Sequence, residues 1–424
     1  MKFFLNKKVS AGALQYTLFI AVLIVLLIST FLTLSFLQNQ FKTKSNFQIQ
    51  CIQNADLGFG YIAENDISYE QEKTIELSTE PESQLVITKK HWGIFDLIQV
   101  QSHVKNARFY KIGLMGGFQS EKPALYLKDN NNALVLVGNT EIRGSAFLPI
   151  NGVKRGNIVG HSYYGNQLIY GTTTQSDKKL PEIKNRSYVE QLSTGMIDLE
   201  DAIYIELEEG LKIINAFSKP TQIYKQQGIV NLRDIQLTGN IIIQSDTLIK
   251  IDKTALLSDV LLIAPNITVM DGVTGNFQAI ASKNITIGSN CNLTYPSVFV
   301  LNEKETENSG TIKKDETAQL LINSNTSIKG IVAFLSKNST GSYLPQIIME
   351  ENSKVIGEVY CDKNFELKGE VSGTVYTSGF IAKQYGSIYQ NHIYNGSILQ
   401  GKLPQQYVGL PIKNSMPKVS KWLY

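Results

Sequence analysis

Three aspartates near the most regular part of the sequence are the first residues to weigh as catalytic groups: Asp252, Asp259 and Asp271. Hydrolysis of a glycosidic bond needs two carboxyl groups, because one protonates the leaving oxygen while the other activates water or attacks the sugar. These aspartates stand singly, and an Asp that follows a predicted strand is typical of a turn. Residues 271–276 (DGVTGN) lack the spaced carboxylates of a Ca²⁺ loop. We therefore expect no catalytic residue, no cofactor and no metal site.

The basic and aromatic candidates have structural interpretations as well. Lys154-Arg155 could bind an anionic ligand, but a solvated turn is the preferred interpretation. His161 beside Tyr163 and Tyr164 could bind sugar, but half-buried packing is preferred. Carboxylates from different coils of a repeat could still converge, so a polysaccharide-degrading enzyme stays as an alternative.

Charge and cysteine content narrow the class of partner. The net charge is +3 on 424 residues, and no stripe of Lys and Arg runs along the chain, so nucleic-acid binding is not expected. The three cysteines, Cys51, Cys291 and Cys361, lie far apart and form no Cys-x-x-Cys pair. We expect buried thiols, with one disulfide as the alternative.

The elements that would position such groups are β-strands, because the chain repeats an apolar–polar–apolar triplet. Ile249-Lys250-Ile251 returns as Ile267-Thr268-Val269 and as Ile285-Thr286-Ile287, two steps of 18 residues. Alternate side chains of a strand share a face. Residues 249, 267 and 285 are therefore expected to stack inside, while residues 250, 268 and 286 face water. This period suits one coil of a parallel β-helix.

Other segments extend this pattern. A second column with the same step is expected at Ile263, Ala281 and Phe299. Residues 302–319 are charged and predict a solvated loop, after which the alternation resumes at residues 327–335 and 354–381. Residues 133–160 show the same alternation of apolar with polar residues and glycines, and are expected to form an earlier part of the stack. The acidic residues 193–210 interrupt it and predict a short helix over an edge.

The N-terminal segment predicts a membrane span. Residues 9–41 contain no charged side chain, and residues 11–37 are almost entirely apolar. At about 1.5 Å per residue this run reaches roughly 40 Å, enough to cross a hydrocarbon core of about 30 Å. It is too long for a cleaved signal peptide. Lys2, Lys7 and Lys8 precede it and favour a cytoplasmic N-terminus. We expect a single-pass protein of a bacterial inner membrane, with its C-terminal domain outside the cytoplasm.

The same segment resembles the N-terminus of a type IV prepilin. The resemblance lies in two lysines, a short gap and Gly12-Ala13, followed by an unbroken apolar helix. In that family a peptidase cuts after the glycine and leaves the helix to pack in a filament, which implies processing between Gly12 and Ala13. The family usually has Glu at the fifth mature position, where this sequence has Thr17.

Two further segments carry resemblances. Residues 50–62 (QCIQNADLGFGYI) are similar to the Ala-acid-x-Gly segment of PilX-type minor pilins, through Ala55, Asp56 and Gly58. Residues 354–381 resemble bactofilins, the polymer-forming bacterial β-helix proteins. That resemblance rests on apolar residues alternating with polar residues and glycines, namely Val355, Val359, Phe365, Leu367, Val371 and Val375.

The expected fold is mainly β, with an N-terminal transmembrane α-helix, a small β unit and a parallel β-helix with coils of about 18 residues. The expected regions are a cytoplasmic tail and transmembrane helix at 1–44, and a juxtamembrane helix and small β unit at 45–116. A parallel β-helix with insertions follows at 117–401, and a C-terminal tail at 402–424. Strands of the small β unit are expected at 73–78, 83–90 and 107–116, and a strand or a strand pair is expected at 91–104.

The expected function is that of a non-catalytic, membrane-anchored structural protein of the cell envelope, in one version a minor pilin-like component of a pilus or secretion assembly. The expected partners are the membrane and either pilin-like or other envelope proteins or further copies of the chain. Alternatives are a bactofilin-like self-assembling scaffold and a β-helix protein that binds or degrades polysaccharide.

Overall fold

The structure is a computed structural model that describes residues 11–77, 83–195, 202–304, 318–337 and 343–423. The predicted cytoplasmic residues 1–10 lie outside the described residues, as do positions 305–317 of the predicted loop and positions 196–201 of the acidic segment. The chain divides into two compact units. Unit 1 comprises Met1–Tyr61, Glu72–Ile87 and Val100–Tyr110, and unit 2 comprises Ile62–Gln71, Thr88–Gln99 and Lys111–Tyr424.

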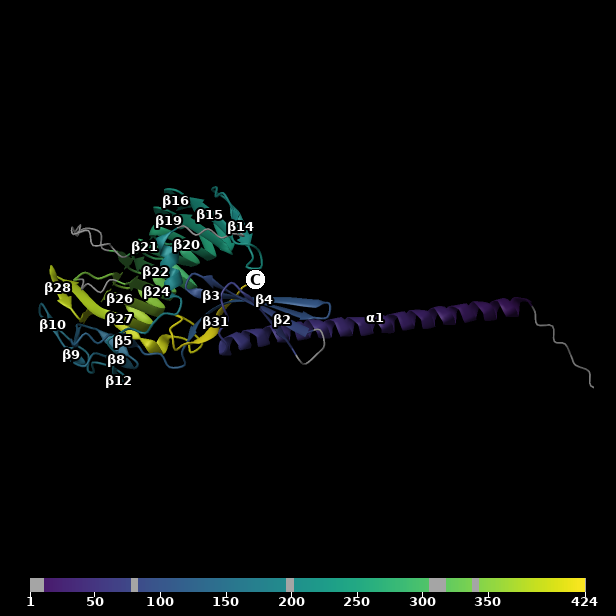
Figure 1. The fold of residues 1–424 in the computed structure, drawn as a ribbon, viewed down its shortest axis with the longest axis horizontal. Helices are drawn as coiled ribbons and strands as arrows, with labels where there is room; N and C mark the ends of the chain where they lie inside the picture. The colour runs from purple at the N-terminus through teal and green to yellow at the C-terminus, as the bar shows by residue number, and fades with distance from the viewer. Residues whose placement is uncertain (1–10, 78–82, 196–201, 305–317, 338–342, 424) are drawn as a thin grey trace, which may run out of the picture. The chain divides into compact units, whose positions relative to one another are not determined.

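The predicted N-terminal helix is present as α1 (Ala11–Glu64), the long purple helix of Figure 1. Its 54 residues correspond to about 80 Å at about 1.5 Å per residue, more than twice the thickness of a hydrocarbon core. The first part exposes large apolar side chains, such as Leu14 at 69% and Phe31 at 70%. By length and composition this helix can cross a membrane.

A five-stranded sheet follows α1 in the chain. Its order is β1-β2-β3-β4-β31. The strands are β1 (Glu72–Glu76), β2 (Ser83–Trp92), β3 (Phe95–Val104), β4 (Ala107–Phe118) and β31 (Met416–Leu423). Turns of two residues join β2 to β3 and β3 to β4, so these neighbours are antiparallel. The predicted segment at 91–104 is split by the first of these turns. Residues 402–424, predicted as a tail, contain β31, which pairs antiparallel with β4.

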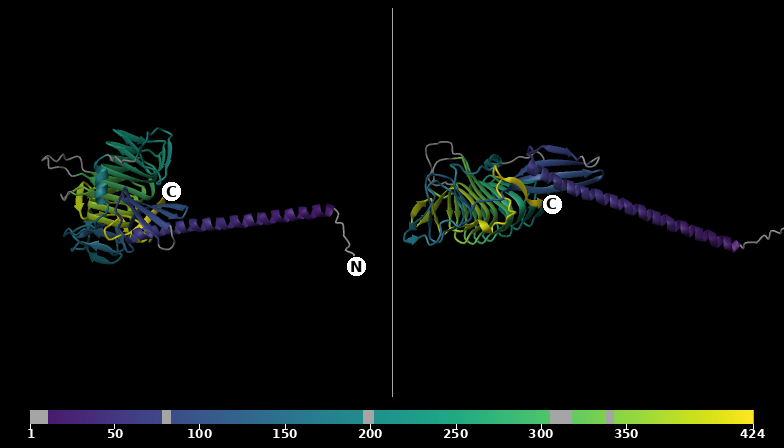
Figure 2. Two further views of the ribbon diagram at one scale, coloured as in Figure 1. Left: turned by 45° about the vertical axis from the view of Figure 1, so that its right-hand side comes forward. Right: turned by 90° about the horizontal axis from the view of Figure 1, so that it is seen from below.

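Most of unit 2 is a closed sheet whose strands stack almost entirely in parallel. Figure 2 shows the successive layers of strands. The central strands are β18 (Ile241–Ser245), β19 (Leu248–Ile251), β20 (Leu256–Val269), β21 (Thr274–Ile287), β22 (Asn292–Glu303), β23 (Gln319–Ile322), β24 (Ser327–Ser336), β25 (Ile347–Met349), β26 (Lys354–Leu367) and β27 (Glu370–Gln384). The strands before them are β12 (Thr173–Gln175), β13 (Ile203–Tyr204), β14 (Lys212–Asn215), β15 (Gln222–Gln226), β16 (Ile229–Leu232) and β17 (Gln236–Gly239). The prediction of a mainly β chain behind a long apolar helix is confirmed.

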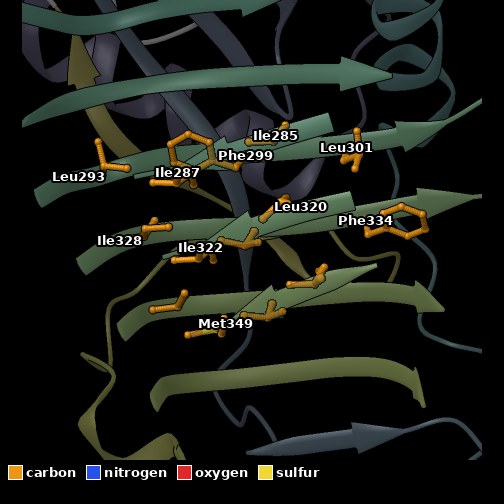
Figure 3. Close-up of a cluster of buried hydrophobic side chains, with 14 of the residues drawn as sticks. Ile285, Ile287, Leu293, Phe299, Leu301, Leu320, Ile322, Ile328, Phe334 and Met349 are labelled. Carbon is orange, nitrogen blue, oxygen red and sulfur yellow. The ribbon is translucent and has the colours of Figure 1, made fainter. Parts of the chain in front are cut away.

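The column of isoleucines expected from the repeat is present. Ile249 pairs in register with Ile267, and Ile267 with Ile285, so both steps are 18 residues. All three are buried, whereas Lys250 on the opposite face is exposed. Pairing continues from position 285 to 320, 347 and 365, in steps of 35, 27 and 18 residues. Figure 3 shows Ile285 and Leu320 among the side chains gathered between the stacked strands. The strands on either side of these longer steps keep the register.

The second predicted column is wrong. Ile263 pairs with Ile280 rather than with Ala281, and Ala281 pairs with position 301, two residues beyond Phe299. Register shifts flank Ile263 on both sides, and Asp259, with φ at 61°, lies in the first of them. An extra residue in one strand turns the following side chains to the other face. Ile263 consequently packs on the outside of the sheet, while Ala281 packs inside.

The upstream segment at 133–160 contributes to the stack, but its place differs from the prediction. Val375 of β27 pairs with Leu125 of β5, and Ile398 of β30 pairs with Ile142 of β7. These early strands therefore follow the C-terminal coil, where they cover a strand edge that would otherwise be unpaired. The elements involved are β5 (Leu125–Leu127), β6 (Leu134–Val137), β7 (Glu141–Arg143), β8 (Ala146–Leu148), β9 (Val153–Arg155), β10 (Asn157–Ile158), β11 (His161–Ser162), β28 (Ser387–Gln390), β29 (His392–Tyr394), β30 (Ser397–Leu399) and the short helix η1 (Gln400–Lys402).

Unit 2 has a second apolar core, on the outer face of one side of the stack. Outward-facing residues include Ile242, Leu261, Ile280, Val298, Ile331, Tyr360 and Tyr376. They are covered by Trp92, Phe95, Leu97, Ile112 and Leu114 and by Val189 and Leu192 of α2 (Arg186–Thr194). The helix predicted at 193–210 overlaps α2 only at residues 193 and 194, because the apolar face that packs on the sheet precedes the acidic residues. The other described residues of 193–210 contain β13, and positions 196–201 lie outside the described residues.

Two carboxylates of unit 2, those of Glu358 and Glu370, are held in place by ion pairs. Lys122 Nζ lies 2.6 Å from Glu358 Oε1, and the two side chains are only 7% and 3% exposed. The other oxygen of Glu358 accepts a hydrogen bond from the backbone N–H of Leu410 at 2.6 Å. Burial alone would raise the pKa of the Glu370 carboxyl, but bonds from one serine and two lysines outweigh it and lower that pKa from 4.5 to about 2.

Candidate functional site

The predicted processing site lies in the first turn of α1. Gly12 and Ala13 are exposed, and a side chain added at Gly12 would meet no atom within 4 Å. Thr17, at the position where prepilins usually carry Glu, donates its hydroxyl to the carbonyl of Leu14 at 2.9 Å. No described part of unit 1 blocks access to the peptide bond between Gly12 and Ala13.

The Ala-Asp-x-Gly segment is where α1 packs on the sheet of unit 1. Cys51, Ala55 and Phe59 recur every four residues and are all buried, so they lie on one face of the helix. A Cβ on Gly58 would lie 2.6 Å from Cγ1 of Val100 in β3. The small residues of this segment therefore permit close approach of helix and strand.

The three candidate aspartates are not brought together. Asp252 caps its own turn by accepting the N–H of Thr254 at 3.0 Å. Asp271 accepts the N–H of Ser289 at 2.7 Å. Asp259 forms an ion pair with Lys421 of β31, with N–O distances of 2.7 and 2.8 Å. Within the described ranges, no three His, Cys, Asp or Glu side chains group closely enough to hold a metal ion.

The remaining sequence candidates also lie apart. Lys154 and Arg155 are exposed in β9, and Arg155 donates to the carbonyl of Asn166 at 3.3 Å. His161 lies 6.0 Å from the ring centroid of Tyr394. The cysteines at 51, 291 and 361 are free and buried. Burial raises the pKa of the thiol at 361 to about 12, which opposes formation of the reactive thiolate.

The structure brings together three rings that no sequence motif connects. Tyr69, His91 and Tyr188 stack face to face, with centroids 3.7 Å apart for the first pair and 4.0 Å for the second. The ammonium group of Lys89 lies 4.2 Å from the centroid of Tyr69. All four residues belong to unit 2. Because Lys89 lies over Tyr69, Tyr69 stacks on His91 and His91 stacks on Tyr188, the stack orients the ring of Tyr188.

The carboxylate of Asp96 organises the polar side of this stack. Its Oδ1 accepts hydrogen bonds from the Tyr69 hydroxyl at 3.1 Å and from the Asn185 amide at 2.8 Å. The same oxygen lies 3.7 Å from Nδ1 of His91. Burial, and then the negative charge of Asp96, raise the pKa of the Tyr69 hydroxyl. Tyr69 therefore remains a neutral donor and helps to hold the stack rigid.

Two clefts share His91 and Tyr188 as lining residues. The first, which we call the polar cleft, has a volume of about 820 Å³ and is also lined by Tyr69, Lys89 and Asp96. The second, the aromatic cleft, has a volume of about 750 Å³. Further lining residues of the aromatic cleft are Trp92, Phe217, Gln99, Lys90, Lys219 and Thr221. Such concave, partly apolar surfaces with a few polar groups are typical of ligand sites.

Sequence reasoning missed this site because its residues come from separate elements. Tyr69 follows α1, His91 lies in β2 and Tyr188 lies in α2. Their separation along the chain gives no periodic signal. The adjacent aromatic residues His91 and Trp92 are the one local signal, and the sequence around them predicts only a strand or a strand pair.

Comparison with known proteins adds little to this geometry. No protein-family model matches the sequence, and no match was found among curated proteins. Among solved structures, the chain matches the competence-associated pilin ComZ from Thermus thermophilus, with 9% sequence identity and a TM-score of 0.18. The match covers 89% of this chain and 97% of the pilin. At this TM-score the similarity supports no conclusion about fold or function.

Proposed function

We propose that the chain is a non-catalytic structural protein of a bacterial envelope, held in the inner membrane by the first part of α1. The observation that carries this proposal is the division of α1 into two parts. Residues such as Leu14 and Phe31 are exposed and apolar, whereas Cys51, Ala55 and Phe59 bury one helix face. A long apolar helix surface is stable in a bilayer or against other apolar helices.

The closed sheet of unit 2 is, in this proposal, a parallel β-helix with coils of about 18 residues. The column at 249, 267 and 285 supports it, because stacked coils bury side chains that no single coil can bury. Such a stack is a rigid body suited to holding a surface at a fixed place in an envelope assembly. The aspartates at 252, 259 and 271 each serve a structural contact, which favours a role without catalysis.

The orientation in this proposal places the C-terminal domain outside the cytoplasm. Lys2, Lys7 and Lys8 before the apolar segment support it, since positive residues favour the cytoplasmic side. Protease added to intact spheroplasts should then digest the C-terminal part. Complete protection of that part, with digestion after lysis, would reverse the orientation.

The particular role we propose is that of a minor pilin-like component of a pilus or secretion assembly, with pilin-like envelope proteins as partners. The exposed Gly12–Ala13 bond and the close packing at Gly58 support it. Mass spectrometry of the protein from a host with a prepilin peptidase should find an N-terminus at Ala13. Gly12→Val should abolish this cleavage, while Gly60→Ala, also in α1, should leave it unchanged. An intact N-terminus in the unmodified chain would refute the pilin-like role and leave the membrane anchor standing.

A self-assembling scaffold of the bactofilin kind is the second candidate, and one observation favours it. The strands β13, β14 and β16 carry Ile203, Ile214 and Ile229, which are 50%, 74% and 48% exposed. Exposed apolar side chains on neighbouring strands mark a surface for association with another copy. Sedimentation of the full chain in detergent should show concentration-dependent polymers that Ile214→Lys reduces. Particles of constant size at high protein concentration would remove this candidate.

A further inference from the structure

The wall of the aromatic cleft contains a tryptophan whose N–H has no acceptor among the described residues. Trp92 is 4% exposed, and its indole Nε1 is buried without a hydrogen-bond partner in the described part of the chain. Buried N–H groups almost always have a partner, because an unpaired one loses its hydration without compensation. Trp92 also lines the cleft, so a ligand that draws the indole ring slightly toward the cleft can supply an acceptor to this buried N–H.

The aromatic walls of the cleft are held in place before any ligand arrives. Trp92 meets Phe217 edge to face, with centroids 5.1 Å apart and an interplanar angle of 83°. Gln99 donates its amide to the carbonyl of Phe217 at 2.7 Å. On the other wall, His91 holds Tyr188 at 4.0 Å between centroids. Rigid aromatic walls reduce the conformational entropy that a ligand must remove on binding.

Polar groups line the rim of the same cleft. Lys90 and Lys219 are exposed, and neither forms an ion pair with any residue in the described ranges. Asn240, another lining residue, accepts a bond from the Thr221 hydroxyl at 3.0 Å and is thereby oriented. The cleft thus combines apolar ring surfaces with directed donors and acceptors.

We propose that the aromatic cleft binds a carbohydrate chain. A sugar ring has one apolar C–H face, which suits aromatic walls, and hydroxyl groups that can accept from the indole N–H and from lysine. A purely apolar ligand would leave the Trp92 N–H unpaired. Nucleic acid needs a larger basic surface than two lysines supply. The proposal concerns unit 2 alone, so it stands or falls independently of membrane anchoring and of processing at Gly12.

The test uses the full chain in detergent micelles with Trp422→Phe, which leaves Trp92 as the reporter among the chain's two tryptophans. The probes are hexamers of N-acetylglucosamine, cellohexaose, maltohexaose and oligogalacturonate, with poly-glutamate as an acidic peptide. We expect a saturable change in Trp92 emission with at least one saccharide. If oligogalacturonate binds more tightly than the neutral oligosaccharides, Lys90 and Lys219 are assigned to its carboxylates. Binding of oligogalacturonate or of a neutral oligosaccharide supports the proposal.

Calorimetry on variants then locates the site. Tyr188→Ala should weaken saccharide binding by about tenfold or more, because it removes one aromatic wall. Trp92→Phe keeps a ring but removes the N–H and should weaken binding by about tenfold. Lys219→Ala, at an exposed rim position, tests the cleft without disturbing the core and should weaken binding severalfold. Tyr385→Ala, at an exposed tyrosine outside the cleft, should leave affinity unchanged.

Three results would overturn the proposal. The first is the absence of saturable binding by every saccharide. The second is wild-type affinity in Tyr188→Ala, Trp92→Phe and Lys219→Ala together, which would place the sugar elsewhere. The third is binding of poly-glutamate alone, which would assign the cleft to an acidic peptide. Circular dichroism of each variant establishes that the fold is retained, and Lys219→Ala decides the matter if a core variant unfolds.

Discussion

Replacing Ile267 by Asp tests the register of the parallel stack. Ile267 is 1% exposed and pairs with Ile249 on one side and Ile285 on the other. Truncation of such a side chain to Ala costs about 2–5 kcal/mol. An unpaired buried carboxylate adds a further cost of several kcal/mol. We therefore expect Ile267→Ala to lower the free energy of unfolding by about 2–5 kcal/mol. Ile267→Asp should lower it by at least about 5 kcal/mol, comparable with the whole stability of many domains.

Thr268 provides the matched control, because it lies next to Ile267 on the opposite face. Its neighbours in the stack are Lys250 and Thr286, and Lys250 is exposed. Thr268→Asp places a carboxylate beside a lysine near water, so we expect a change below about 1 kcal/mol. The assay is urea unfolding of the full chain in detergent, followed by Trp92 fluorescence in the Trp422→Phe background. Equal losses at both positions, or a larger loss at Thr268, would refute the register.

Three other perturbations have definite expected outcomes. Gly58→Ala should lower the free energy of unfolding of unit 1 by about 1 kcal/mol in thermal melts, because the added methyl group meets β3. Gly60→Ala should raise it by about 0.5–1 kcal/mol, because the added methyl group meets no atom and alanine favours the helix. Equal effects of the two substitutions would contradict the packing of α1 on β3. Glu358→Gln should lower the free energy of unfolding in urea by about 3–5 kcal/mol, since it leaves Lys122 buried without its charged partner. A loss below about 1 kcal/mol would show that the ion pair is not buried. The Glu370 carboxyl has a folded pKa of about 2 against an ordinary 4.5, so its contribution to stability is complete above pH 4.5 and is lost as pH falls toward 2. Glu370→Gln should flatten the stability profile in that window, and an unchanged acid profile would contradict the assigned shift.

Some features of this protein follow from the order of residues alone. The apolar segment at 11–37 predicts a long apolar helix of a length that can cross a bilayer, because no charge interrupts it, and α1 confirms the helix. The triplets at 249, 267 and 285 predict parallel stacking and the buried face, because alternation in a strand assigns each side chain to one side. Both features are local, so a short window of sequence contains the information that determines them.

Other features were decided by contacts between distant segments. The bulge at Asp259 moved Ile263 to the outer face, and a single added residue of this kind leaves no mark on the apolar pattern. The return of β5 onto β27 depends on which strand edge remains unpaired at the end of the stack. The same holds for β31, which joins the N-terminal sheet from the far end of the chain.

The candidate site belongs wholly to this second group. Its rings come from the segment after α1, from β2 and from α2, and they meet because the outer face of the stack is apolar and must be covered. The sequence by itself determined which residues are apolar and which strands alternate. Only the tertiary structure decided that Tyr188 would stack on His91 and that Trp92 would line a cleft while its buried N–H has no acceptor among the described residues. The hydrophobic effect is non-directional, so the shape and available apolar surface of distant segments determine which of them pack together. The alternation along a strand, by contrast, specifies only which face of the sheet each side chain lies on.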